Sequence, residues 1–416
     1  MDRLALTTKA PYRQRGDVRT CERPPAGFEV IYVDVICRHG SRTMARPRLA
    51  EGFARLLDRA ADVGRLTPRG QELRAVLREL LEVTAALGAG MLTGSGRREA
   101  RDIGVRLARR VPALWRPDGV DVVSAGKART TDSAATFVDG LRSAAPGLGT
   151  QRPSLRVDDA LLYFHKSDAR YREYVDNDPR PRAAIAVAWR DPNTRRAVHS
   201  VLCGAMTPTF VATVDAGDHR DLFADGRAAA SALYTTWAAA AGLGDEGNWR
   251  FHRFVPPAAA AWFGYLDDLE TFFLKGPAFA DEDVTYAMAR PLLDDVFARF
   301  GNVRGHPAGP VATLRFTHAE EILPLATLLR LPGSTDPEPP GRRFTYADNP
   351  FRGAEVAPMG ANIQWELYGD GSRYLVRMLR DEQPVAFPPN CAPIAAGSCF
   401  YDLDVLQRAW ASGARP

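Results

Sequence analysis

Apolar residues form an almost continuous run from Val30 to Cys37, in which Asp34 is the one charged position. A short apolar run rich in β-branched residues is typical of a strand buried on both faces of a parallel sheet. Shorter runs of the same kind cover residues 121–124 and 311–316. A polar turn and then a helical pattern follow each run, so the chain is predicted to be an α/β protein.

Helical periodicity fills the gaps between these strands. Apolar residues recur at helical spacing over residues 49–61. Thr67 is a typical N-cap and Pro68 a typical first helical residue, and together they begin the next predicted helix. Further helices are predicted to begin near Ser95 and around Arg129. Strand, polar turn and helix therefore alternate through the first third of the chain.

The same alternation returns near the C-terminus. A helix is predicted over residues 284–300, before the strand at 311–316, and an apolar helix over 322–331. The segments 362–368 and 374–379 flank a Gly-Asp-Gly turn and are predicted to form a β-hairpin. These elements are predicted to belong to the same α/β core as the first strand.

Residues 153–276 have a different pattern. They are helical, rich in alanine and aromatic residues, and without a strand signal. Such a stretch between two α/β regions is typical of an inserted helical cap. We therefore predict an α/β sandwich core from residues 1–150 plus 280–416, with an α-helical cap formed by residues 151–279.

Composition changes this picture little. The 416 residues are 45% hydrophobic and 25% charged, and the formal net charge is +4. These are ordinary values for a soluble globular protein. No apolar stretch could span a bilayer, the first residues lack a secretory signal, and no basic stripe alternates with aromatic residues. We expect a cytoplasmic protein with neither a membrane nor a nucleic-acid partner.

The five cysteines are scattered and lack the spacing of a zinc site. Buried free thiols are the expected state, although Cys391 and Cys399 could pair in an exported protein. Among 54 cationic residues there are four lysines, so arginine supplies nearly all the positive charge. Arginine forks suit phosphate wherever several of them converge.

Candidate chemistry begins where the first strand ends, at the sequence Arg-His-Gly-Ser-Arg of residues 38–42. Ligands of open α/β sheets bind beyond the carboxyl ends of parallel strands. There Arg38 and Arg42 would flank His39, an imidazole that can act as a nucleophile. Gly40 would allow a tight turn and close approach of a ligand. The alternative is a loop with two solvated arginines and a surface histidine.

Two other strand ends add to this group. Arg129 follows the strand at 121–124, and His318 and Glu320 follow the strand at 311–316. A helix that begins near His318 would direct its amides and positive dipole end at a bound phosphate. The alternative for Glu320 is an ordinary acidic residue in a first helical turn.

Together these residues would compose a phosphomonoester hydrolase that needs no metal or other cofactor. Phosphoryl transfer mainly requires positioning and cationic stabilisation, which three arginines and a histidine can provide. His39 would attack phosphorus, and protonated Glu320 would donate its proton to the leaving alkoxide. Glu321 lies beside Glu320 and could compete for this role.

These motifs resemble the histidine acid phosphatases, and specifically their multiple inositol polyphosphate phosphatase branch, in which His-Ala-Glu replaces His-Asp. Residues 8–12, 124–133, 269–276 and 351–367 carry further similarity. The resemblance implies that His39 is the nucleophile and Glu320 the proton donor. It implies that the reacting phosphate is bound by Arg38, Arg42, Arg129 and His318.

The same resemblance identifies Lys9 and Lys275 as candidates for a cationic substrate rim, and it implies an inositol polyphosphate substrate. Two alternatives remain open. The substrate could be a sugar or nucleotide phosphate from a specialised biosynthetic pathway. The chain could also be a non-catalytic relative that binds a phospholigand, in which case loss of the nucleophile or the acid would be expected.

Overall fold

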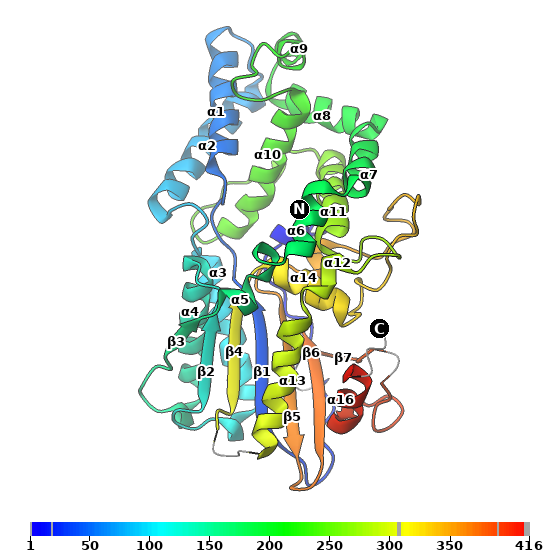
Figure 1. Ribbon diagram of the computed structural model, residues 1–416. Coiled ribbons are helices and arrows are strands. Elements are labelled where there is room, and N and C mark those ends of the chain that lie inside the picture. Colours follow the sequence, from blue (N-terminus) through cyan, green and yellow to red (C-terminus); the bar gives the residue numbers. More distant parts are fainter. Residues whose placement is uncertain (1, 18–19, 306–308, 389–390, 412–416) are drawn as a thin grey trace.

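The computed structural model describes all residues except 1, 18–19, 306–308, 389–390 and 412–416 (Figure 1). At its centre the described residues form an eight-stranded sheet in the order β3-β2-β4-β1-β5-β6-β7, with β8 paired to β6. The strands are β1 (Glu29–Arg38), β2 (Val120–Ser124), β3 (Leu155–Val157), β4 (Ala312–Thr317), β5 (Asn362–Gly369), β6 (Tyr374–Arg380), β7 (Gln383–Val385) and β8 (Phe400–Asp402).

The predicted nucleophile follows the central strand. β1 pairs in parallel with β4 and antiparallel with β5. β4 also pairs in parallel with β2, and β2 with β3. The predicted hairpin is present, because β5 and β6 are antiparallel neighbours. The three strands that precede the candidate site residues, β1, β2 and β4, therefore lie side by side and point the same way.

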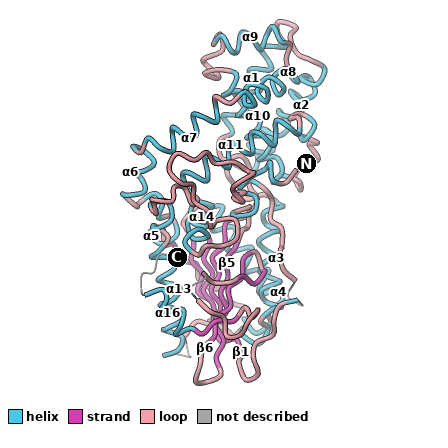
Figure 2. The backbone as a smooth tube through the Cα atoms, turned by 90° about the vertical axis from the view of Figure 1, so that its right-hand side faces the viewer, coloured by secondary structure: helices cyan, strands magenta, loops and turns pink. Residues whose placement is uncertain are grey.

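Helices cover both faces of this sheet (Figure 2). Val33 and Val35 pack with residues of α3 (Gly94–Arg110) and α4 (Ala128–Ala144) in one apolar cluster. Tyr32 points to the other face, where its ring lies 6.1 Å from that of Phe300 in α13 (Arg290–Gly305). Alternate residues of β1 are thus buried on opposite faces, which explains its continuous apolar run.

The helices that were predicted in the first third of the chain are present. They are α1 (Pro47–Asp62), α2 (Pro68–Leu87), α3 and α4. Thr67 is the N-cap of α2, and its side chain accepts a hydrogen bond from the Gly70 N–H. α3 is capped by Thr93, slightly before the predicted start.

A helical region lies above the carboxyl edge of the sheet (Figures 1 and 2). It contains α5 (Asp159–Leu162), α6 (Ala169–Asn177), α7 (Pro179–Trp189), α8 (Pro192–Ala205), α9 (Pro208–Ala216), α10 (Gly226–Ala240) and α11 (Pro257–Lys275). α1 and α2 also pack there, and the Thr67 N–H donates to the Ala205 carbonyl at 3.0 Å. The division at residues 151 and 279 stays a prediction, and this packing favours a cap that also includes residues 47–87.

One expectation for this region is wrong. Residues 153–276 were expected to contain no strand, yet β3 pairs with β2 at the edge of the sheet. Its three residues are exposed, so they lack the apolar pattern of a buried strand. After the cap, α12 (Val284–Ala287) and α13 lead to β4; α14 (Ala319–Leu328), α15 (Gly353–Val356) and α16 (Leu403–Ala411) follow later.

Short 3-10 helices complete the described elements. They include η1 (Leu4–Lys9), at the N-terminus, and η5 (Phe164–Lys166), next to α5. Cys391 and Cys399 are both thiols. Among the described helices, none has the length and apolar character needed to cross a membrane. The cytoplasmic location stays a prediction.

Candidate active site

The sheet register brings the three predicted strand ends together. Arg38 is paired with Thr317 across β1 and β4, and Ser124 is paired with Phe316 across β2 and β4. The chain leaves all three strands at the same edge. The ring centroids of His39 and His318 consequently lie 5.4 Å apart.

The His39 ring is held in one tautomer. Its Nδ1 lies 2.9 Å from the Gly40 carbonyl oxygen, which can only accept a hydrogen bond, so Nδ1 carries the proton. The lone pair of Nε2 is therefore available for attack. Burial lowers the pKa of His39 well below its usual range, and the charges of Arg38 and Arg42 lower it further. A neutral imidazole is the form that a nucleophile requires.

Three arginines form a cationic cluster beside this ring. Arg38 is almost completely buried and donates through Nη1 to the carbonyl oxygens of Thr8 and Ala357. Burial and repulsion by Arg42 lower the pKa of Arg38 to about 9. Burial and repulsion by Arg129 lower the pKa of Arg42 to about 10. These guanidiniums repel one another, so a dianion placed among them would be strongly stabilised.

Several buried polar atoms of the cluster have no partner within the described chain. They are the Nε donors of Arg38, Arg42 and Arg129 and the two ring nitrogens of His318, of which one is a donor in the neutral ring. Buried polar groups are usually satisfied, and exceptions are common at functional sites. Unsatisfied donors and positive charge together fit a phosphate group. The described residues contain no group of three or more His, Cys, Asp or Glu side chains that could hold a metal ion.

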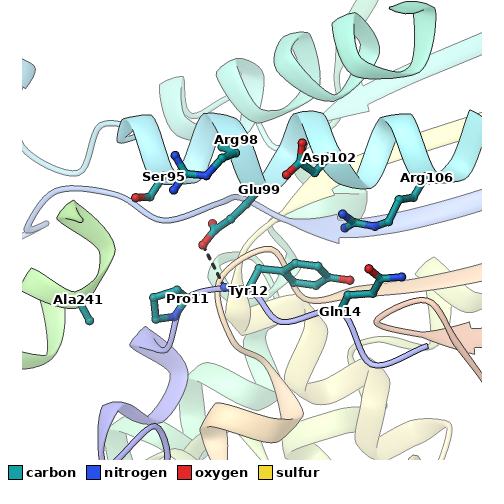
Figure 3. A pocket seen from close by; sticks show the side chains of 9 residues that line it. All are labelled: Pro11, Tyr12, Gln14, Ser95, Arg98, Glu99, Asp102, Arg106 and Ala241. Carbon is teal, nitrogen blue, oxygen red and sulfur yellow. Dashed lines mark hydrogen bonds between the residues drawn. The ribbon is translucent and has the colours of Figure 1, made fainter. Parts of the chain in front are cut away.

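Glu99 supports the turn that carries the nucleophile. Its carboxylate accepts hydrogen bonds from the Ser41 N–H at 2.7 Å, the Ser41 hydroxyl at 2.8 Å and the Tyr12 N–H at 3.0 Å. Figure 3 shows Glu99 reaching from α3 toward Tyr12, beside a cavity of about 420 Å³. The sequence contained no signal for this role, because Glu99 is one of many charged residues in an amphipathic helix.

Close backbone packing explains the glycine in this turn. A Cβ atom on Gly40 would lie 2.5 Å from the Gly96 carbonyl oxygen, and one on Gly96 would lie 2.0 Å from the Ser41 carbonyl oxygen. Contact with the first turn of α3 therefore requires a glycine at position 40. This packing is a further reason for glycine at position 40, beside the tight turn and the close ligand approach that the sequence predicts.

The two adjacent glutamates have separate surroundings. Glu321 is fully buried and accepts hydrogen bonds from His165 Nδ1 at 2.5 Å, the Thr317 hydroxyl at 3.0 Å and the His318 N–H at 3.3 Å. The Glu320 side chain is 30% exposed and accepts a hydrogen bond from Lys275 Nζ at 2.9 Å. Glu321 is thus occupied in holding the start of α14, and Glu320 is the more accessible acid.

Lys275 is the main cation acting on Glu320. Burial would raise the pKa of Glu320, but Lys275, with His165 and Arg38, lowers it, and together they hold this pKa well below its usual range. The other predicted rim residue, Lys9, pairs with Asp267 of α11 at 2.9 Å. The charges of Lys9 and, more weakly, Lys275 both lower the pKa of Asp267, so both lysines lie near this carboxylate of α11.

The cap adds aromatic neighbours, and the turn before α4 a cationic one, that were not predicted. The Tyr163 ring lies 5.2 Å from the His318 ring and 4.6 Å from the His165 ring. Lys127 Nζ lies 5.0 Å from the centre of the Tyr163 ring, within cation–π distance. Tyr163 and His165 come from the stretch that was interpreted only as cap, so nothing in their spacing pointed to the site.

A sheet whose carboxyl edge presents a neutral histidine among arginines is typical of a class of phosphatases. The chain belongs to the histidine phosphatase superfamily (branch 2), whose family profile matches residues 29–381. The predicted α/β fold, the family and the enzyme class are thereby confirmed.

Curated relatives and solved structures are similar to this chain over most of its length. Multiple inositol polyphosphate phosphatase 1 of Gallus gallus is 22% identical over 414 residues, 94% of this chain and 85% of that protein. A crystal structure of the Bifidobacterium longum multiple inositol polyphosphate phosphatase with phosphate has a TM-score of 0.90 and 27% identity, and covers 98% of this chain and 97% of that one. A phytase from D. castellii, 14% identical over 98% of this chain and 84% of its own, shares the fold with a TM-score of 0.68.

Proposed function

We propose that this phosphatase hydrolyses phosphomonoesters of inositol polyphosphates through a phosphohistidine on His39. The observation that carries the proposal is the free Nε2 of a neutral histidine beside a cluster of arginines with unsatisfied buried donors. The cluster would hold the oxygens of the reacting phosphate and stabilise the charge that spreads over them during transfer.

The reaction would proceed in two displacements. His39 Nε2 attacks phosphorus, the P–O bond to the leaving alkoxide breaks, and protonated Glu320 gives its proton to that alkoxide. A water molecule then attacks the phosphohistidine, the P–N bond breaks, and Glu320 takes the proton from the water. Arg38, Arg42, Arg129 and His318 would bind the phosphate throughout.

Two observations support an inositol polyphosphate as substrate. The curated relatives are multiple inositol polyphosphate phosphatases, and the similar Bifidobacterium longum enzyme has been crystallised with inositol hexasulfate. Lys275, at the end of α11, also donates a hydrogen bond to Glu320, and Lys127 lies beside the Tyr163 ring. These ammonium groups offer positive charge beyond the three arginines that would hold the reacting phosphate.

Phosphate release from a panel of inositol phosphates, sugar phosphates and nucleotides tests the substrate class. We expect the highest kcat/KM with inositol polyphosphates. Preference for a sugar phosphate or nucleotide would overturn this part of the proposal.

Rapid acid-free denaturation during turnover of a ³²P-labelled substrate tests the intermediate. We expect label on His39, with the acid lability of a phosphohistidine, and its absence from His39→Ala, which should have no turnover. His252→Ala, which removes an exposed histidine of the cap, is the matched control and should keep both label and turnover. Undiminished turnover in His39→Ala would exclude covalent catalysis by this residue.

A further inference from the structure

The ion pair between Lys275 and Glu320 conflicts with the role of a proton donor. Lys275 is the last residue of cap helix α11, and Glu320 lies in the first turn of core helix α14. Their charged atoms are 2.9 Å apart, and each side chain is about one-third exposed. A general acid must carry its proton when the P–O bond breaks, whereas an ammonium at this distance favours the ionised carboxylate.

Several other charged or titratable groups, from its own helix and from other elements, also act on Glu320. They are Arg38 and Arg42 beside the nucleophile, Arg129 on α4, Tyr163 and His165 from the cap, Tyr171 on α6, and His318 and Glu321 at the start of α14. Glu320 raises the pKa of Lys275 most, and Tyr171 and Glu270 raise it further. Its direct hydrogen bond makes Lys275 the strongest of the cations that act on Glu320.

A bound phosphate would neutralise only part of this positive charge. The reacting group would sit among Arg38, Arg42 and Arg129 and cancel much of their field. Lys275 belongs to a different element and already has a carboxylate partner. A second anion on the substrate is the group that could attract the ammonium away from Glu320.

The residue type suits such an exchange. Lysine has a compact charge on a flexible stem, whereas arginine forms fixed two-point contacts with a carboxylate. The chain has four lysines among 54 cationic residues, and one of them stands at this position. Lys275 is therefore a cation that can change partners.

We propose that Lys275 is a positioning residue that selects polyphosphorylated substrates, because a non-reacting phosphate takes its ammonium and thereby frees Glu320 to become the proton donor. The inference rests on the proposed function and assigns a specificity device to the same site. Freed Glu320 takes a proton from solvent and passes it to the alkoxide. A substrate with a single phosphate leaves the ion pair intact, so its leaving group departs without this assistance.

The experiment compares kcat as a function of pH for phytate and glycerol 2-phosphate. Since Glu320 must be protonated, kcat falls as pH rises through its pKa in the enzyme–substrate complex. In the wild type we expect this fall at a pH about one unit or more higher with phytate than with glycerol 2-phosphate. In Lys275→Met the glycerol 2-phosphate profile should move up to meet the phytate profile, while KM for phytate rises.

Two variants separate this effect from loss of charge or of fold. Lys275→Arg keeps the charge but holds the carboxylate at two points, so the fall with phytate should move down toward that with glycerol 2-phosphate. Lys166→Met removes an exposed lysine of the cap and should keep the difference between the two substrates. Coincident profiles in the wild type, or a difference that persists in folded Lys275→Met, would overturn the proposal.

Failure of the proposed function gives a different result. p-Nitrophenyl phosphate has a leaving group that needs little protonation, so its hydrolysis reports the nucleophile without the acid. Absence of this hydrolysis in the wild type would reject the phosphohistidine mechanism itself. Its presence, combined with coincident pH profiles for phytate and glycerol 2-phosphate, would reject only the role of Lys275.

Discussion

In the proposed mechanism, His39 attacks phosphorus only while Nε2 keeps its lone pair. Protonation of the ring would stop this attack, so the pKa of His39 sets the lowest pH at which the enzyme is active. Burial and the neighbouring arginines both disfavour the imidazolium and lower the pKa of His39. Burial and Arg129 likewise lower the pKa of His318 to about 3. Both rings therefore stay neutral at pH values where an ordinary histidine is charged.

We expect activity to persist into the acid range. Because a lowered pKa extends the neutral form of His39 to lower pH, kcat/KM for p-nitrophenyl phosphate should show no fall between pH 7 and pH 5 that traces to its protonation. The measurement is the pH profile of kcat/KM, corrected for ionisation of the substrate. A tenfold loss centred near pH 6.5 would contradict the inferred state of the nucleophile.

Glu320→Gln should lower turnover of alkyl phosphates roughly 10²–10⁴-fold, the usual range for general acid catalysis. The loss should be much smaller with p-nitrophenyl phosphate, because this leaving group needs little protonation. Steady-state kinetics with both substrates measures the difference. Equal losses with the two substrates would show that Glu320 is not the acid.

Glu321→Gln is the matched comparison. Glu321 is buried against His165 and the start of α14, so its loss should reduce stability and affect both substrates alike. A larger loss with alkyl phosphates than with p-nitrophenyl phosphate would transfer the role of acid to Glu321.

At the scale of elements, the contact between the turn at residues 39–42 and α3 fixes the position of His39, the proposed nucleophile. Alanine normally favours a helix over glycine by about 1 kcal/mol. At position 96, however, the added Cβ would meet the Ser41 carbonyl oxygen at 2.0 Å, a backbone atom that can move only with the turn. We expect Gly96→Ala to lower kcat/KM by roughly 10²-fold or more through displacement of His39.

Gly204→Ala provides the control for this prediction. Gly204 lies in helix α8, and a Cβ atom there would meet nothing within 4 Å. This variant should keep full activity and gain a little thermal stability. Activity assays and melting temperatures of both variants make the comparison, and an active Gly96→Ala protein would contradict the tight packing.

The strand ends are the part of the site that sequence patterns could predict. Parallel strands place their carboxyl ends at one edge, so Arg38, His39 and His318 could be grouped from their positions after apolar runs. Glu99 and His165 could not, since their partners are set by packing between distant segments. β3 was missed for another reason: its three residues are too few for an alternating pattern to be recognised.

At the scale of the molecule, Asp268 joins the cap to the core. This buried carboxylate of α11 accepts hydrogen bonds from the Gly353 N–H at 3.0 Å and the Tyr346 hydroxyl at 2.7 Å. Burial raises the pKa of Asp268 to about 7. In the unfolded chain the pKa of an aspartate is about 3.9, so the folded state favours the protonated form.

Stability should therefore decrease as pH rises. The contribution of Asp268 is fully present below the unfolded pKa and is lost as pH rises through about 7. We expect deprotonation of Asp268 to lower the free energy of unfolding by on the order of 2–4 kcal/mol between pH 4 and pH 8. Denaturant titrations across this range, with Asp268→Asn as the comparison, measure the contribution. An equally steep pH dependence in Asp268→Asn would assign it to other groups.

The central position of β1 also determines when the site can form during synthesis. Both strands that flank it are encoded far downstream: β4 at Ala312–Thr317 and β5 at Asn362–Gly369. The His39 N–H itself donates to the Thr317 carbonyl, so this histidine is anchored by a residue that the ribosome adds almost 280 positions later. Until β4 has been made, a nascent chain would thus hold His39 at the end of an unpaired apolar strand, which is prone to aggregation. The second partner of β1 follows only when β5 is complete at Gly369.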